Sequence, residues 1–169
     1  MQDAITNILN KYDLTGKYLD AFAMNELTSY FSQAFIRIKA IELINSQASK
    51  IVKEAAARLY EEQPELLRPG GNSYTTRRYA ACLRDIGYYL RYASYAIIAG
   101  NTNILNERLL DGLRETYNSL NVPIGPTIRS IKILEEIIQG ALKFDQSNDK
   151  LLVSEPFEYI ANTLSEQNI

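Results

Sequence analysis

The residues best suited to chemistry in this chain surround its one cysteine, Cys82. The segment from Arg68 to Asp85 reads RPGGNSYTTRRYAACLRD and combines a thiol with arginines, a carboxylate and tyrosines. On an ideal helix, Arg78 and Asp85 share the face of the Cys82 thiol. A thiolate can add to an electrophilic double bond, an arginine can grip a carboxylate, and a carboxylate can accept hydrogen bonds from N–H groups. The set favours a covalently tethered, anionic, aromatic ligand.

Other side chains of this segment fit such a ligand less directly. Arg77 and Arg84 project away from the thiol face in ideal geometry, so they reach a ligand only if it is long or the helix begins irregularly. The alternatives are an inert buried cysteine and a solvated helix face with surface ion pairs. Six of the twelve tyrosines lie near Cys82, as ligand-lining side chains or as ordinary core and surface residues: Tyr74, Tyr79, Tyr88, Tyr89, Tyr92 and Tyr95.

Composition excludes several functions. The 169 residues predict a single domain over 1–169, and the net charge of −2 does not indicate a nucleic-acid binder. One cysteine cannot form an internal disulfide, and no signal peptide or membrane-spanning run is visible. Because the chain has no histidine, we expect no catalytic residues and no metal site. An enzyme with Cys82 as nucleophile would need Arg78 or a helix N-terminus alone to activate the thiol.

Helical periodicity runs through the first half of the chain. We expect a short amphipathic helix in the first dozen residues, interrupted at Leu14–Gly16. A longer helix should follow, with four apolar residues on one face: Leu27, Phe31, Phe35 and Ile38. A third helical stretch should end near Gln63–Pro64, since the residue before a proline disfavours helix; its apolar residues are Val52, Ala55, Ala56 and Leu59.

The second half is also helical. A helix is predicted over Thr76–Ala99, closed by Gly100–Asn101, with an apolar stripe of Tyr79, Leu83, Ile86 and Leu90. Two shorter helices should cross Ile104–Leu120, before a break at 121–126. A strong helix follows, with Ile131, Leu134, Ile138 and Ala141 in phase. We expect a mobile turn over Asp145–Lys150 and one more helical turn at 156–160.

These elements predict an all-α fold, a globin-like helical bundle with two extra N-terminal helices. The first helix is too short to be stable alone, so it must dock. It can dock on its own domain or on a partner subunit, and we favour the partner. Residues 1–30 would then be an N-terminal helical extension for subunit pairing.

The Cys82 motif resembles the chromophore-attachment segment of phycobiliprotein β-type subunits, in the allophycocyanin group. Similar stretches occur at Met1–Thr6, Gly16–Asp20, Tyr88–Tyr95 and Gly112–Leu120. Within the group, three further segments are similar to a minor β subunit of the phycobilisome core rather than to the abundant one: Glu65–Arg68, Pro123–Thr127 and the tail around Glu155–Phe157.

The resemblance implies one phycocyanobilin, an open-chain tetrapyrrole, bound covalently through Cys82. It implies that Asp85 holds the inner pyrrole nitrogens and that Arg78 and Arg84 hold propionates, with Arg77 as a weaker candidate. The remaining implied site residues are Asn72, methylated on its side-chain amide, and the cleft-lining Tyr88 and Tyr117. We also expect Gly87 to loosen the cleft beside the chromophore.

The resemblance also implies partners and a place in the cell. An allophycocyanin α-type subunit would form a heterodimer with this chain, using Asp13 and Arg91, and the heterodimers would assemble into trimeric discs. We expect the tail, or the face beside it, to contact a core linker protein. The implied function is light harvesting, peripherally on the stromal or cytoplasmic face of the thylakoid membrane, without direct membrane insertion. The alternative is a colourless structural or assembly subunit of the same fold.

Overall fold

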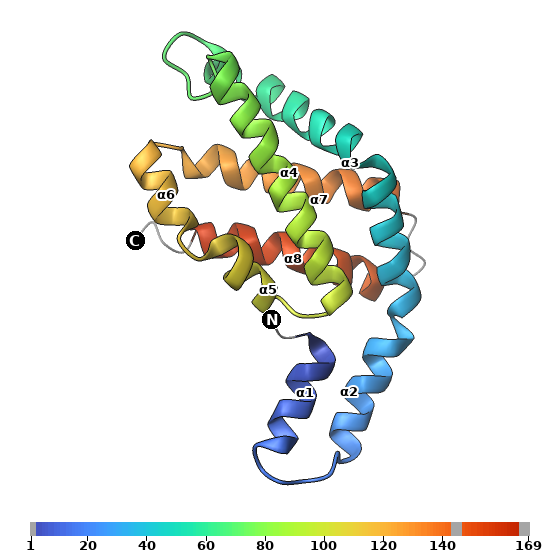
Figure 1. Ribbon diagram of the computed structural model, residues 1–169. Helices are drawn as coiled ribbons and strands as arrows, with labels where there is room; N and C mark the ends of the chain where they lie inside the picture. The colour runs from blue at the N-terminus through green and yellow to red at the C-terminus, as the bar shows by residue number, and fades with distance from the viewer. Residues whose placement is uncertain (1–2, 143–146, 166–169) are drawn as a thin grey trace.

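The computed structural model describes residues 3–142 and 147–165, and these form helices without any strand (Figure 1). The predicted all-α, globin-like fold with two extra N-terminal helices is confirmed. The elements are α1 (Ala4–Asp13), α2 (Ala21–Ser32), α3 (Ala34–Glu62), η1 (Pro64–Leu67), α4 (Thr76–Ala99), α5 (Asn103–Leu105), η2 (Asn106–Leu110), α6 (Leu113–Leu120), α7 (Ile124–Ala141) and α8 (Ser147–Ser165).

Helices α1 and α2 form a pair that projects from the helical body (Figure 1). Each begins at an aspartate whose carboxylate accepts a backbone N–H of the first turn: Asp3 from Thr6 at 2.7 Å and Asp20 from Ala23 at 3.0 Å. The Tyr12 hydroxyl donates to the same Asp20 carboxylate at 2.6 Å and so ties the two helices together. Local capping therefore fixes both helix starts.

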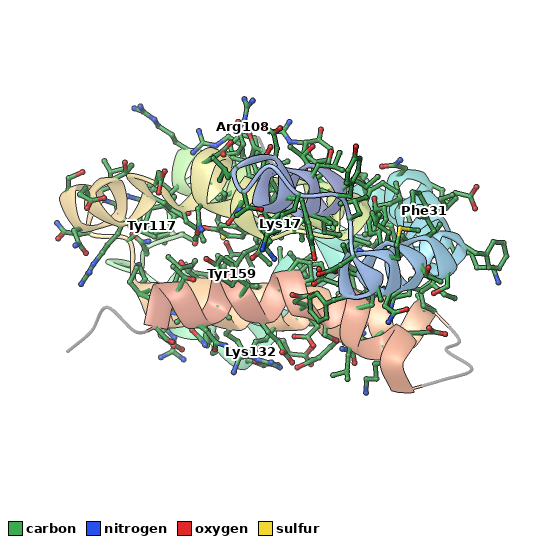
Figure 2. The ribbon with its side chains drawn as sticks, turned by 90° about the horizontal axis from the view of Figure 1, so that it is seen from below. Lys17, Phe31, Arg108, Tyr117, Lys132 and Tyr159 are labelled. Carbon is green, nitrogen blue, oxygen red and sulfur yellow. The ribbon has the colours of Figure 1, made fainter. Side chains whose placement is uncertain are left out.

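The apolar face predicted between Leu27 and Ile38 does not enter the core of this chain. Gln33 ends α2 and precedes α3, so the predicted helix is divided in two. The side chains of Phe31 and Phe35 are 59% and 64% exposed, and Ile38 is also exposed. Seen from below, α1 and α2 lie in front of the body, with Phe31 on α2 (Figure 2). The face stays uncovered because α2 extends beyond the body.

Two contacts fix the end of α2 and the start of α3 to the end of α4. The buried Arg37 side chain donates from Nη1 to the carbonyl of Ile97 at 2.5 Å. The Tyr30 hydroxyl donates to the carbonyl of Ile98 at 2.8 Å. Gly100 closes α4 with φ of +61°, as predicted, and a Cβ there would lie 2.7 Å from the Tyr30 ring. Glycine is therefore needed for both the turn and the contact.

The core lies between α3, α4, α7 and α8, where Leu59, Ile97, Leu134, Phe157 and Ile160 are buried. The expectations for the chain end are partly wrong. Residues 147–150 belong to α8, and this helix runs well past the single turn expected at 156–160; residues 145–146 lie outside the described part. Pro156 lies inside α8, which continues because its apolar face packs on α7.

The smaller predictions have mixed outcomes. The two short helices expected across Ile104–Leu120 are present, separated by a turn at Asp111–Gly112. Tyr79 and Ala141, both placed on apolar stripes, are exposed, since Tyr79 lies near the start of α4 and Ala141 is the last residue of α7. Among the described residues, no helix combines the length and apolarity needed to cross a bilayer.

Candidate ligand-binding site

Cys82 lies half-buried on α4, between α3 and the loop that precedes α4. Tyr60 of α3 and Ser73 of the loop both interact with its thiol. Burial raises the pKa of the Cys82 thiol, while the two hydroxyls act in the opposite direction. The thiol is therefore protonated near neutral pH, with two hydroxyls beside it.

The loop holds its shape through a close approach of backbone to backbone. The N–H of Gly71 donates to the Arg68 carbonyl at 2.8 Å, and that of Ser73 donates to the Leu66 carbonyl at 2.9 Å. A Cβ at Gly71 would lie 2.4 Å from the carbonyl oxygen of Glu65, so only glycine fits. This packing against η1 places Asn72 and buried Ser73 near the start of α4.

Asp85 is the acceptor at the centre of a second cluster. Its Oδ1 accepts from Arg84 Nε at 3.0 Å and from Arg84 Nη2 at 2.8 Å, and its Oδ2 accepts from the Tyr117 hydroxyl at 3.2 Å. The Tyr117 hydroxyl also contacts that of Tyr89 in a short hydrogen bond. Burial raises the pKa of both tyrosines, so they stay neutral hydrogen-bonding groups. Tyr117 thereby joins α6 to α4.

The arginines divide into one paired and two unpaired side chains. Arg84 was expected to point away from the thiol face, but its long side chain turns back to Asp85 and remains 59% exposed. Arg77 and Arg78 are exposed in the first turn of α4. Neither side chain forms an ion pair or hydrogen bond within the part of the chain that the structure describes. Two free cations thus lie one turn before Cys82.

Tyr88 lies outside the Asp85 cluster. Its ring is partly exposed between two guanidinium groups, with Arg84 at 5.8 Å and Arg91 at 4.9 Å from the ring centroid. Asp13, at the end of α1, is also exposed. Arg91 is exposed as well, and its guanidinium lies 5.1 Å from the centroid of the Tyr92 ring.

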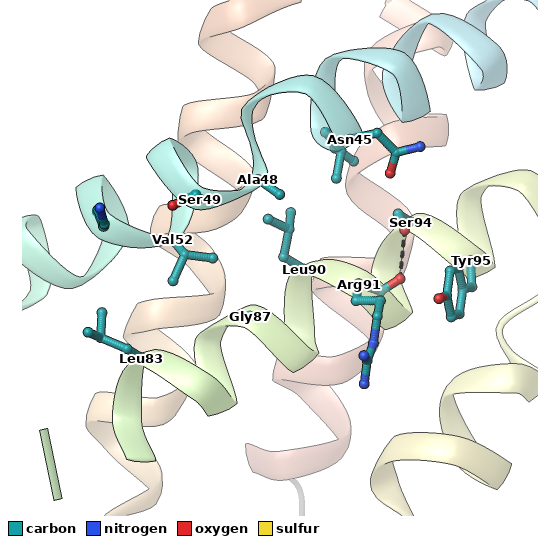
Figure 3. Close-up of a pocket in the computed structure, with 12 residues that line it drawn as sticks. Asn45, Ala48, Ser49, Val52, Leu83, Gly87, Leu90, Arg91, Ser94 and Tyr95 are labelled. Atoms are coloured by element: carbon teal, nitrogen blue, oxygen red, sulfur yellow. Dashed lines mark hydrogen bonds between the residues drawn. The ribbon is translucent and has the colours of Figure 1, made fainter. Parts of the chain in front are cut away.

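A hollow of about 480 Å³ lies between α3 and α4 but does not include Cys82 or Asp85 (Figure 3). Leu83, Gly87 and Leu90 line it from α4, facing Val52 of α3. A Cβ at Gly87 would meet Val52 Cγ2 at 3.9 Å. Five residues of helix place Gly87 about 140° from Cys82, and its expected effect on the ligand cleft stays a prediction.

Sequence reasoning missed three residues of the site. Tyr60 and Ser73 reach Cys82 from other segments, and no local spacing indicates them. Tyr89 was noted only as one of the clustered tyrosines, although its position four residues after Asp85 places it on the same helix face. Of the other clustered tyrosines, Tyr79 stacks on Tyr60, whereas Tyr92 and Tyr95 pair with each other at 5.8 Å and Tyr95 lines the α3–α4 hollow.

Comparison with known proteins identifies the family. Residues 7–164 match the phycobilisome protein family. The chain belongs to this family. It is 66% identical to allophycocyanin subunit beta-18 of Aglaothamnion neglectum and 65% identical to that of Porphyra purpurea, in each case over the whole of both chains. The corresponding protein of Synechocystis sp. is 54% identical over the same full span. The predicted resemblance is thereby confirmed.

Phycobilisome proteins of this kind are pigment-bearing antenna proteins and not enzymes. Phycobiliproteins carry covalently bound bilins, and allophycocyanin β subunits pair with α subunits. The phycobilisome itself is a peripheral antenna complex on the thylakoid. The chain is accordingly a light-harvesting subunit of the phycobilisome core.

Proposed function

We propose that this subunit carries one phycocyanobilin, joined by a thioether to Cys82, and passes its excitation energy on towards the photosystems. The observation that carries the proposal is the arrangement on α4. A half-buried thiol lies between two free cations, Arg77 and Arg78, and a carboxylate held by Tyr117. In an open-chain tetrapyrrole, the thiol matches an electrophilic double bond, the cations match the acidic side chains, and the carboxylate matches the pyrrole N–H groups.

The donor set fits this pigment. Arg78 and Arg77 offer five N–H donors each to propionates, and Asp85 offers acceptors to the pyrrole N–H groups. When bound, the pigment supplies the visible absorption, and the carboxylate favours its protonated, cationic form. Arg84 is exposed, so it can leave Asp85 for a propionate at small cost, because exposed ion pairs contribute only about 0–1 kcal/mol.

Rigid elements hold the walls of the proposed site. Tyr117 is buried and anchored to α4 through Asp85 and Tyr89, and Tyr88 is held between two guanidinium groups. Such anchoring limits twisting of a bound tetrapyrrole, which would otherwise dissipate the excitation. Asn72, in the loop fixed by Gly71, is the residue that we propose is methylated on its side-chain amide.

We further propose that the N-terminal pair binds an allophycocyanin α-type subunit. Large exposed apolar side chains gather on the α1–α2 connection, on α2 and at the start of α3: Leu14, Tyr18, Phe22, Met24, Phe31, Phe35 and Ile38. Exposed apolar groups in such number mark an interface rather than a free surface. Asp13 and Arg91 add charges for the same contact. The heterodimers would build trimeric discs, and a core linker protein would contact the face beside the C-terminal tail.

Replacing Phe31 and Phe35 together with glutamate is expected to weaken binding of the α-type subunit by at least about a hundredfold. The change places two charges where aromatic anchors would be buried. Sedimentation velocity of the purified pair measures it. Leu151→Glu, at a 62% exposed leucine on α8, is the matched control and should still pair. Normal pairing by the double variant would contradict the assigned interface.

Intact mass and a zinc-fluorescence gel on protein from its native source test the pigment itself. The expected result is a mass increase of one linear tetrapyrrole, mapped to the peptide that contains Cys82. The alternative, a colourless assembly subunit, predicts an unmodified mass and a free thiol that an alkylating reagent can label. That outcome would reject the pigment assignment and leave the pairing proposal standing.

A further inference from the structure

The hydroxyl of Tyr60 is a buried donor without a hydrogen-bond partner of normal geometry in the described residues. The Tyr60 side chain is only 7% exposed, and its ring stacks on that of Tyr79 with centroids 5.4 Å apart. Nearly all buried hydroxyls in proteins are paired, so an unpaired one needs an explanation, such as a role in the chemistry of the site. The thiol of Cys82 is the functional group beside it.

The other groups around the thiol do not offer the same help. Arg77 and Arg78, one turn before Cys82, are exposed, and neither is among the groups that shift the pKa of its thiol. Asp85 on α4 acts on Cys82 through its negative charge, which opposes a thiolate. Tyr89 and Tyr117 are engaged with each other. The exposed ring of Tyr79 packs against Tyr60. That leaves Tyr60 from α3 and the buried Ser73 from the loop as the hydroxyls that favour the charged sulfur.

We propose that Tyr60 is a positioning residue for pigment attachment: its hydroxyl donates a hydrogen bond to the Cys82 sulfur and stabilises the thiolate that reacts. Attachment is an addition, in which the S–H bond breaks, sulfur bonds to one carbon of a C=C bond, and the proton passes to the other. Atoms and electrons balance without an oxidant or a reductant. Only the thiolate is nucleophilic, and burial disfavours it here. A donated hydrogen bond offsets that penalty.

The inference rests on the proposed function, but its test does not need the pigment. Full-length apoprotein, made in a host without bilin, is alkylated with iodoacetamide over a range of pH values. In Tyr60→Phe the rate at neutral pH is expected to fall about tenfold, with its half-maximum moved to higher pH, because a hydrogen bond to a charged group is lost. Tyr79→Phe keeps the Tyr60 hydroxyl and should match the wild type.

A pH–rate profile of Tyr60→Phe that overlays the wild-type profile would overturn the inference. The variant should fold, since it removes one hydroxyl and keeps the ring, and a melting curve checks this. If it unfolds, Ser73→Ala provides the second test, with a smaller shift in the same direction expected and an unchanged profile counting against the hydroxyl pair.

Slower bilin loading of Tyr60→Phe would extend the result. Failure of loading in wild type would reject the proposed function and leave the thiol result intact.

Discussion

Replacing Cys82 with alanine is expected to remove all covalent pigment, from one per chain to none, while the helical fold is kept. Cys82 is the only thiol in the sequence, so no second attachment point exists. Alanine suits a helix interior, and the side chain it replaces is only half-buried. A zinc-fluorescence gel under denaturing conditions measures covalent pigment directly.

The control for this change is the wild-type chain made in the same pigment-producing cells. Any pigment that remains with Cys82→Ala should be released on denaturation, because it would be held only by the arginines and Asp85. Pigment that stays on the denatured variant would show that another side chain is the attachment point. A melting curve close to that of the wild-type apoprotein would confirm that the loss is chemical and not a failure to fold.

The second large effect is expected at Asp85. Asparagine at this position keeps the shape and an oxygen for Tyr117 but removes the charge. Attachment should still occur, while the visible band of the loaded protein should weaken and move to the blue, because the carboxylate no longer favours the protonated pigment. Absorption spectra of native protein, normalised to pigment content after acid denaturation, measure the change.

Glu115→Gln serves as the comparison for Asp85→Asn, since it removes an exposed carboxylate from α6, the helix of Tyr117. Its spectrum should equal that of the wild type. An unshifted spectrum in Asp85→Asn itself would remove the proposed role of this carboxylate without affecting the assignment of Cys82.

Local sequence patterns predicted much of the fold correctly. The start and end of α4 agree with the structure because Thr75 and Gly100 act through neighbouring backbone groups. The length of α8 was underestimated because a proline such as Pro156 is typical of the first turn of a helix. Packing against α7 keeps the helix continuous through this residue. The face of Phe31 and Phe35 could not be assigned, since an apolar stripe looks the same whether it meets its own core or another subunit.

Helical spacing predicted only those residues of the candidate site that lie on one helix, α4. Cys82, Arg78 and Asp85 follow from helical spacing and from the family resemblance. Tyr60 and Ser73 contact the thiol from other segments, α3 and the loop before α4. Helical periodicity within α4 therefore cannot indicate them. Arg84 departed from ideal geometry because a long, flexible side chain can reach its sequence neighbour whatever direction its Cβ takes.

The contacts of Arg37 and Tyr30 with the last carbonyls of α4 have a consequence for energy transfer. Tyr30 joins the proposed docking pair, and Arg37 joins the start of α3, to the same helix that bears Cys82. A partner seated on α1 and α2 would thus be positioned relative to the end of α4. The angle between the transition dipoles of neighbouring pigments, on which the rate of excitation hopping depends, would then be set at one helix end. Loss of the Arg37 and Tyr30 contacts would widen the range of angles between the transition dipoles, although no residue that contacts the pigment would change.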